Sequence, residues 1–324
     1  MNTSTAVAGP QSAPGVILMA VFRPDHALLE QQLMSIRQQD VTQWSCIVGI
    51  DGFDAGAEES VRAVIGEDER FSIVNFEVNL GFYRNFERLL ALADRTAAWV
   101  ALADQDDVWD TSKLRVLTDE LATRQVSLVA CQARIVDARG VVTGHTDRQQ
   151  VSLPTLLLDN QVTGSLAVLD PSILRVALPF PEPEPNSYHD HWLGVVAAAV
   201  DGYAIVDDIL QSYVQHGGNV IGEATGSDVR GRMGRLVAGG PSAGLNRLAT
   251  QRWGWRQRMA REIGRRRPSA LADPGVRAIA EGGLSADLVR ELVRAGRARH
   301  VGWLRLVALG VGAVLPARDA RSPH

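Results

Sequence analysis

Short apolar runs alternate with amphipathic stretches along the first part of the chain. Four of these runs are mostly apolar, at positions 15–22, 44–51, 71–77 and 97–104, and the last three end in an acidic residue. Such runs are typical of strands that are covered on both faces. Between them, apolar positions recur at helical spacing, as in the set Leu28, Leu29, Leu33 and Ile36. The alternation predicts an α/β fold with a parallel sheet and helices on both of its faces.

The second part of the chain is mixed in pattern. Residues 126–142 and 160–170 resemble strands, residues 187–202 form a strongly apolar helix, and residues 203–218 are predicted to form a pair of strands. From about Gly222 the sequence becomes rich in Gly, Arg and Ala, with helical patterning. We therefore predict three parts: a disordered lead-in over residues 1–14, an α/β domain over 15–222, and a basic, mostly helical C-terminal region over 223–324.

The charge of the chain is unevenly distributed. The formal net charge is -4, which argues against nucleic acid as a partner. From Gln251 to the end there are 15 Arg and no Lys against 6 Asp and Glu, so this segment carries +9 and the remainder -13. A basic region on an acidic body suggests peripheral contact with an anionic membrane surface or an acidic partner. A solvated Arg-rich helical face, including "GRRRP" at 264–268, explains the same charges.

The first residues, the lengths of the apolar stretches and the two cysteines together predict a cytoplasmic protein. The first fifteen residues lack the basic and apolar regions of a signal peptide. No uninterrupted apolar stretch reaches the roughly 18–20 residues that a membrane-spanning helix needs. Cys46 and Cys131 lie in apolar segments and are expected to be core residues in a reducing compartment. We expect a cytoplasmic location, with peripheral contact at the inner face of the plasma membrane as an extension of it.

Acidic residues follow two of the predicted strands. Asp51 ends the second strand, and Asp104, Asp106 and Asp107 follow the fourth. Ligands of open parallel sheets bind beyond the carboxyl ends of the strands, and Mg²⁺ is commonly held by one or two carboxylates together with substrate phosphates. A turn capped by Asp110 or Thr111 is the simpler explanation for part of this cluster. It does not explain acids at both Asp104 and Asp106, whose repulsion calls for an offsetting cation.

Three segments in fixed order carry a family resemblance. "GIDGFD", "NLGFYRNFERLLALA" and "ALADQDDVWDTSKL" resemble the inverting family 2 glycosyltransferases of GT-A fold, and in particular their rhamnosyltransferase-like branch. The resemblance covers about Val16 to Gly222 and implies a Rossmann-like, mostly parallel sheet with a helical C-terminal extension. It implies transfer of a sugar, with a rhamnose-like sugar favoured, from a dTDP- or UDP-linked donor with inversion. The implied acceptor is a saccharide or a lipid-linked saccharide in cell-surface polysaccharide synthesis.

The resemblance also implies roles for individual residues. The residues implied to bind the nucleotide sugar are Phe22, Asp51, Arg84, Asn85, Asp104 and Gly164. The residues implied to hold Mn²⁺ or Mg²⁺ are Asp104, Asp106 and His216. Asp190 falls where the family has its catalytic base. Apart from the resemblance, we place Trp109, His189 and His191 on the acceptor side, with core packing as the alternative for the two histidines.

Each of these roles has a simpler alternative from the residues alone. Asp190 can cap the apolar helix that follows it, His216 beside two glycines is typical of a turn, and Arg84 fits an exposed helix face. Trp109 fits either a lid over the site or a stacking surface for sugar. The sequence also departs from the family at the base-binding end, where Ile50 replaces an acid and Phe22 stands where tyrosine is usual. These departures indicate a shifted donor pocket.

Two other functions fit parts of the pattern. In a haloacid-dehalogenase-type phosphatase, "DQDDV" would supply Asp104 as a nucleophile, and "IVDD" at 205–208 would supply a later acidic motif. That motif normally follows the first strand of its domain, whereas three strand–helix units precede it here. A non-enzymatic nucleotide-binding protein is the second alternative. Stabilisation by a nucleoside diphosphate that depends on metal distinguishes the transferase from both.

Overall fold

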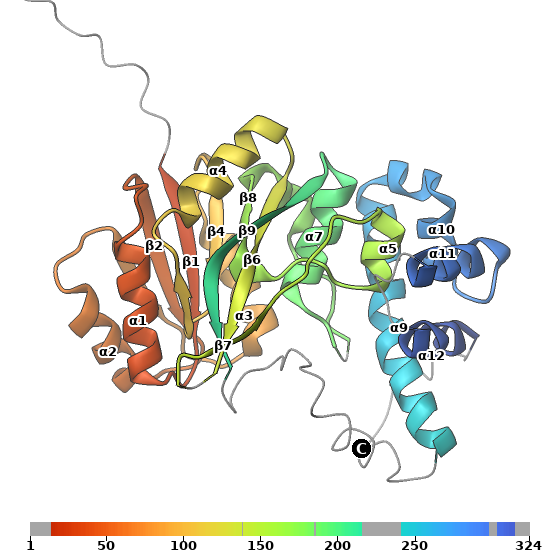
Figure 1. The fold of residues 1–324 in the computed structure, drawn as a ribbon, viewed down its shortest axis with the longest axis horizontal. Helices are drawn as coiled ribbons and strands as arrows, with labels where there is room; N and C mark the ends of the chain where they lie inside the picture. Colours follow the sequence, from red (N-terminus) through yellow and green to blue (C-terminus); the bar gives the residue numbers. More distant parts are fainter. Residues whose placement is uncertain (1–13, 138, 185, 216–240, 298–302, 315–324) are drawn as a thin grey trace, which may run out of the picture.

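A nine-stranded sheet forms the centre of the computed structural model, which describes residues 14–137, 139–184, 186–215, 241–297 and 303–314 (Figure 1). The strands are β1 Gly15–Val21, β2 Trp44–Ile50, β3 Phe71–Asn75, β4 Val100–Ala103, β5 Asp107–Trp109, β6 Leu128–Val136, β7 Val142–His145, β8 Ala167–Leu169 and β9 Tyr203–Val214. Their order is β3-β2-β1-β4-β8-β6-β9-β5, and β7 pairs with β6. The first four strands in this order are parallel, while β8 is antiparallel to both of its neighbours. The predicted α/β fold is confirmed, with a sheet that is parallel on one side and mixed on the other.

Helices cover both faces of the sheet. They are α1 His26–Arg37, α2 Ala55–Ile65, α3 Gly81–Leu92, α4 Lys113–Arg124, α5 Leu153–Leu158, α6 Leu174–Ala177, α7 His189–Ala199, α9 Pro241–Arg266, α10 Pro274–Glu281, α11 Ala286–Arg297 and α12 Trp303–Val314, with short 3-10 turns at Gly164–Leu166, Pro171–Ile173 and Pro268–Ala272. Val16 and Leu18 of β1 belong to the hydrophobic cluster that α3 and α7 cover, whereas Ile17 and Met19 belong to the cluster under α1, α2 and α4. Because successive strand residues point to opposite faces, the continuous apolar runs follow from this double cover.

The C-terminal helices extend one of these clusters. Figure 1 shows α9 to α12 gathered at one end of the molecule, beyond α5 and α7. Trp255 of α9 is fully buried, and its ring meets Tyr83 edge-on at 5.8 Å between centroids. Several arginines of this region are used internally: Arg256 donates to the Leu158 carbonyl and Arg266 to the Val176 and Ala177 carbonyls. Among the described residues, no helix has the length and hydrophobicity that crossing a membrane requires.

Two local expectations were wrong. The segment predicted as a pair of strands contains one long strand, β9. Asp207 and Asp208 do not end the strand, because they are exposed beside an irregularity in its pairing with β6 and the strand continues past them. Asp110 does not cap α4: both of its carboxylate oxygens accept from Arg134, at 2.8 and 2.6 Å. Helix α1 is capped by Asp25, whose side chain accepts from the N–H groups of Ala27 and Leu28.

Candidate active site

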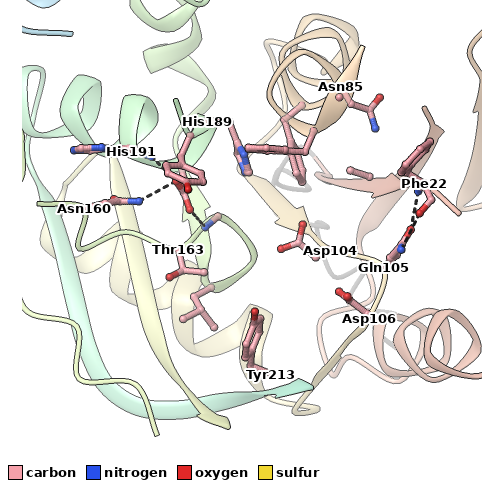
Figure 2. A pocket seen from close by; sticks show the side chains of 18 of the residues that line it. Phe22, Asn85, Asp104, Gln105, Asp106, Asn160, Thr163, His189, His191 and Tyr213 are labelled. Atoms are coloured by element: carbon pink, nitrogen blue, oxygen red, sulfur yellow. Dashed lines mark hydrogen bonds between the residues drawn. The ribbon is translucent and has the colours of Figure 1, made fainter. Parts of the chain in front are cut away.

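A cavity of about 840 Å³ opens at the carboxyl ends of β1, β2 and β4. Its volume lies in the range of small-molecule sites. The wall opposite these strands is formed by the start of α7 and the loop that follows α5 (Figure 2). The cavity gathers most of the residues predicted from the sequence: Phe22, Asp51, Asn85, Asp104, Asp106, Gly164, His189, Asp190 and His191. His216 lies outside the described residues.

Asp51 anchors the end of the cavity that lies at the carboxyl end of β2. This carboxylate is buried, and its Oδ1 accepts from the Leu80 N–H at 2.9 Å and from Arg88 at 2.6 Å. Arg88 lies over the ring of Phe76, 3.5 Å from its centroid, and also donates to Asn85. The arginine that contacts Asp51 is therefore Arg88, which the sequence analysis missed. The one available signal was the spacing, since Arg88 follows Asn85 by three residues on the same helical face.

Arg84 lies elsewhere. Its guanidinium pairs with Glu87 at 2.5 Å and Glu182 at 2.8 Å, and it lines a smaller hollow beside the main cavity. Arg84 and Asn85 are consecutive in α3, so their side chains point in directions about 100° apart around the helix axis. The structure therefore does not bring Arg84 to the cavity wall.

The segment Asp104–Asp106, called the D-x-D segment below, faces the middle of the cavity. Gln105, between the two acids, accepts from the Phe22 N–H at 2.7 Å and donates to the Phe22 carbonyl at 3.1 Å, which ties the loop after β1 to the loop after β4 (Figure 2). Burial holds the pKa of Asp104 well above its usual range, and the charges of Asp107, Asp106 and Asp190 raise it further. Negative charge is thus concentrated here beyond what the local donors offset.

These acids fit a divalent cation that arrives with a phosphate. Two carboxylates, Asp104 and Asp106, are the hard oxygen ligands that Mg²⁺ or Mn²⁺ takes, with phosphate oxygens and water completing the shell. The raised pKa of Asp104, caused first by burial and then by neighbouring carboxylates, supports the fit, because a cation would favour the ionised form of this group. Within the described part of the chain, no group of three or more His, Cys, Asp or Glu side chains is arranged to hold a metal by itself.

A buried polar cluster supports the D-x-D segment from behind. Lys113 donates to the Ser165 carbonyl at 2.5 Å and to Gln211 Oε1 at 2.6 Å, and Gln211 donates in turn to Asp107 at 2.6 Å. Burial lowers the pKa of Lys113 to about 8 and raises that of Asp107 to about 7. The cluster joins α4, β9 and the turn at Gly164 to the strand that follows Asp106. Sequence analysis missed Lys113 and Gln211, because a lysine and a glutamine in amphipathic segments carry no signal of burial.

Trp109 belongs to this cluster and not to the acceptor side. Its side chain is buried, and the Lys113 ammonium lies 3.8 Å from the ring centroid. The prediction of a lid or stacking surface at Trp109 was wrong, since the side chain of Trp109 packs in the core between the sheet and α4.

Asp190 lies on the opposite wall, in the first turn of α7. Its Oδ1 accepts from Asn160 Nδ2 at 2.9 Å and from the His191 N–H at 2.6 Å, and its Oδ2 accepts from the Gly164 N–H at 3.2 Å. Tyr188, not Asp190, occupies the N-cap position, so the simple capping role does not apply. The carboxylate is buried, oriented and directed to the cavity that the D-x-D acids also line.

The two histidines that flank Asp190 differ in their surroundings. His191 is buried, and its Nε2 donates to the Leu156 carbonyl at 2.7 Å. His189 stacks on Phe86, with 3.9 Å between ring centroids, and neither of its ring nitrogens has a hydrogen-bond partner among the described residues. Burial lowers the pKa of His189 to about 4, against a smaller opposing effect of Asp190, so the ring is neutral at physiological pH.

Gly164 is required by the approach of His189. A Cβ at this position would lie 2.5 Å from His189 Nε2. We expect Gly164→Ala to lower the free energy of unfolding by about 1–3 kcal/mol, since either the ring or the loop must shift. Urea denaturation measures the change. Gly144→Ala is the matched control, because its Cβ would meet only Ile135 Cδ1 at 4.0 Å. Equal stability of the two variants would contradict this packing.

His189 should make the stability of the protein depend on pH. The unfolded chain takes up a proton on this residue below about pH 6.5, whereas the folded protein does not until about pH 4. The free energy of unfolding therefore falls as the pH falls through this interval, by about 2 kcal/mol between pH 7.5 and pH 5 at 1.36 kcal/mol per unit. We expect His189→Leu to remove that part of the slope in urea titrations at the two pH values. An identical slope in both proteins would show that His189 is not buried as a neutral ring.

Comparisons with known proteins agree with this architecture. Residues 16–173 match the sequence model of the family described as Glycosyl transferase family 2. No curated protein matches the sequence. The structure of S. aureus TarS 1-349 in complex with UDP-GlcNAc is 11% identical, with a TM-score of 0.54, and the match covers 90% of this chain and 93% of that one. Against the longer S. aureus TarS structure, at 12% identity and a TM-score of 0.54, the match covers 86% of this chain and 54% of that one.

A second protein has a similar fold. The mannosyltransferase PcManGT from Pyrobaculum calidifontis, in complex with GDP-Man and Mn²⁺, is 17% identical with a TM-score of 0.50, and the match covers 97% of this chain and 90% of that one. At these identities the two likenesses show the fold alone, which is the GT-A fold. The fold is thus GT-A, and the match of residues 16–173 to the Glycosyl transferase family 2 model indicates that the protein is a glycosyltransferase.

Proposed function

We propose that this protein transfers a sugar from a dTDP- or UDP-linked donor to a saccharide or lipid-linked acceptor, with inversion at the anomeric carbon. The observation that carries the proposal is that a pair of carboxylates suited to a metal faces a single, separately oriented carboxylate across one cavity. Asp104 and Asp106 line one side, and the oriented carboxylate of Asp190 lines the other. A leaving diphosphate and an attacking hydroxyl need these two kinds of group on opposite sides of the sugar.

The donor would lie along the strand ends. The nucleoside would occupy the end formed by Phe22, Asp51 and Asn85, and the diphosphate would lie beside Asp104 and Asp106. A bound Mn²⁺ or Mg²⁺ would neutralise the negative charge that develops on the departing diphosphate. TarS and PcManGT were solved with UDP-GlcNAc and with GDP-Man and Mn²⁺, which supports a nucleotide-sugar donor and a divalent cation for this chain. The family resemblance favours a rhamnose-like sugar.

Asp190 would act as the general base. It would take the proton of the acceptor hydroxyl as that oxygen attacks the anomeric carbon, and the bond to the diphosphate breaks with its electron pair leaving on the phosphate oxygen. One displacement of this kind inverts the anomeric configuration. The phosphatase alternative needs Asp104 as a nucleophile, and the family match over residues 16–173 gives it no support. The buried and oriented carboxylate of Asp190, on the wall opposite the D-x-D acids, favours a transferase over a binding protein without activity.

Surface polysaccharide synthesis at the inner face of the plasma membrane is the setting we propose. An acceptor anchored in lipid would bring the enzyme to an anionic surface, and exposed arginines of α11 such as Arg290 and Arg294 would favour that contact. Each of them is paired with an acid three residues earlier on the same helix, so the contribution per arginine would be small.

Thermal unfolding with nucleotides tests the donor site. We expect UDP or dTDP to raise the melting temperature, and to raise it further when Mn²⁺ is present, because Asp104 and Asp106 would hold the cation and favour binding of the diphosphate. UMP and dTMP are the matched controls, since they lack the second phosphate and should show little dependence on Mn²⁺. The proposal fails if no nucleoside diphosphate changes the melting temperature with or without the metal.

A further inference from the structure

The two carboxylate oxygens of Asp190 are used unequally. Oδ1 accepts two short hydrogen bonds, from Asn160 Nδ2 at 2.9 Å and from the His191 N–H at 2.6 Å. Among the described residues, Oδ2 accepts only one, from the Gly164 N–H at 3.2 Å. A carboxylate oxygen has about two lone-pair sites. Oδ1 is therefore saturated, whereas Oδ2 retains capacity for one more proton donor.

The amide of Asn160 has only one orientation that fits its surroundings. Its Oδ1 accepts from the Val162 N–H at 3.0 Å, which leaves Nδ2 to face Asp190 (Figure 2). Turning the amide would place an oxygen against the carboxylate and an NH₂ group against a backbone N–H. The loop therefore presents a donor, and never an acceptor, to Oδ1.

Both donors to Oδ1 are anchored at the same helix. Asn160 follows the last residue of α5, Leu158, by two positions. The ring of His191 is tied to the carbonyl of Leu156, which lies within α5. This double attachment fixes the side chain of Asp190 relative to α5 and α7, independently of any bound substrate.

We propose that Asn160 is a positioning residue, which saturates Oδ1 of Asp190 so that Oδ2 takes the proton of the attacking hydroxyl. The inference rests on the proposed function of Asp190 as the base. The acceptor O–H proton moves to Oδ2, the acceptor oxygen bonds to the anomeric carbon, and the bond from that carbon to the diphosphate breaks with its electron pair. Asn160 takes no part in these bond changes. It holds the side chain of Asp190 in the rotamer that the transfer needs.

Other titratable and charged groups surround Asp190 and must be held constant in a test. His189 and His191 flank it on α7, and Asp104 faces it from the end of β4. The same cavity is also lined by Asp159 of the loop, Arg148 from the segment after β7, and Arg256 from α9. A substitution at Asn160 that keeps its shape leaves all of these in place. Asn160→Asp is that substitution, because it replaces an N–H donor with a like charge at the same distance.

The first measurement is the pH dependence of donor hydrolysis, in which water replaces the acceptor. With UDP-glucose, UDP-N-acetylglucosamine, UDP-galactofuranose or dTDP-rhamnose, whichever the wild type hydrolyses, we expect Asn160→Asp to move the acidic limb of kcat/KM upward by about one pH unit or more. The KM for the donor should stay within about twofold, because Asn160 acts on the base and not on uniform donor binding. Gln149→Glu, an exposed residue of the neighbouring loop, adds the same charge and should leave the profile in place.

The second measurement does not require activity. In protein labelled with ¹³C at the carboxyl carbon of aspartate, the resonance of Asp190 is the one that Asp190→Asn removes. In Asn160→Asp, the resonance of the new carboxylate is the additional one that persists in the double variant Asn160→Asp with Asp190→Asn. We expect the titration midpoint of the Asp190 resonance to rise in Asn160→Asp and not in Gln149→Glu. If the wild type hydrolyses no donor but the midpoint still moves in Asn160→Asp, the proposed function is wrong while the contact between Asn160 and Asp190 is confirmed. An unmoved midpoint and an unmoved acidic limb would overturn the role of Asn160.

Discussion

Asp190→Asn is expected to lower kcat by about 10³-fold, which lies within the usual contribution of a general base. The substitution keeps the size of the side chain and its bond with Asn160, but the amide cannot take a proton from the acceptor hydroxyl. Donor affinity should change little, because the nucleotide and diphosphate would contact the strand ends and not this wall. Steady-state turnover together with calorimetric donor binding separates the two effects.

The control for this variant is Asp147→Asn, which removes an exposed carboxylate from a neighbouring loop outside the cavity. It should keep full turnover. Turnover at the wild-type level in Asp190→Asn would remove this residue as the base. Loss of donor binding in step with turnover would assign it to the donor site instead.

Asp106→Ala is expected to abolish the dependence of donor binding on Mn²⁺. Loss of a residue that only orients a metal ligand typically costs 10–100-fold in metal affinity, so loss of a ligand should cost at least about 100-fold in donor affinity measured with the metal present. Binding without metal should be weak in both proteins and nearly equal. Calorimetry with UDP or dTDP, with and without Mn²⁺, gives all four values.

Asp110→Asn provides the comparison within the same stretch of sequence. Asp110 pairs with Arg134 and does not line the cavity, so its loss should leave donor binding unchanged. If Asp106→Ala binds the donor as tightly in Mn²⁺ as the wild type does, the ligand role of Asp106 is wrong.

The strands and their acids could be predicted from the sequence because both depend on local pattern. Continuous apolar runs identify strands that are covered on two faces, and β1 contributes alternate residues to two separate clusters. Parallel strands place their carboxyl ends along one edge, so Asp51, Asp104 and Asp106 were expected to lie together and do line one cavity. Asp190 came only from the family resemblance, since an acid at the start of an apolar helix is otherwise a common cap.

The supporting residues could not be predicted because their contacts are distant in sequence. Lys113 meets the Ser165 carbonyl across 52 positions and Gln211 across 98. The choice of Arg88 over Arg84 depends on the rotation of α3 about its axis. Trp109 was predicted to be a lid over the site or a stacking surface for sugar, whereas the buried ammonium of Lys113 lies over its ring.

The most direct test of the account is the incubation of purified protein with dTDP-rhamnose, UDP-galactofuranose, UDP-glucose and UDP-N-acetylglucosamine in Mn²⁺, with products followed by ³¹P and ¹H NMR. The account predicts that at least one donor releases its nucleoside diphosphate and a free sugar of inverted anomeric configuration, and that Asp190→Asn stops the release. Retention of configuration, release of inorganic phosphate in place of a nucleoside diphosphate, or no hydrolysis of any donor would contradict it.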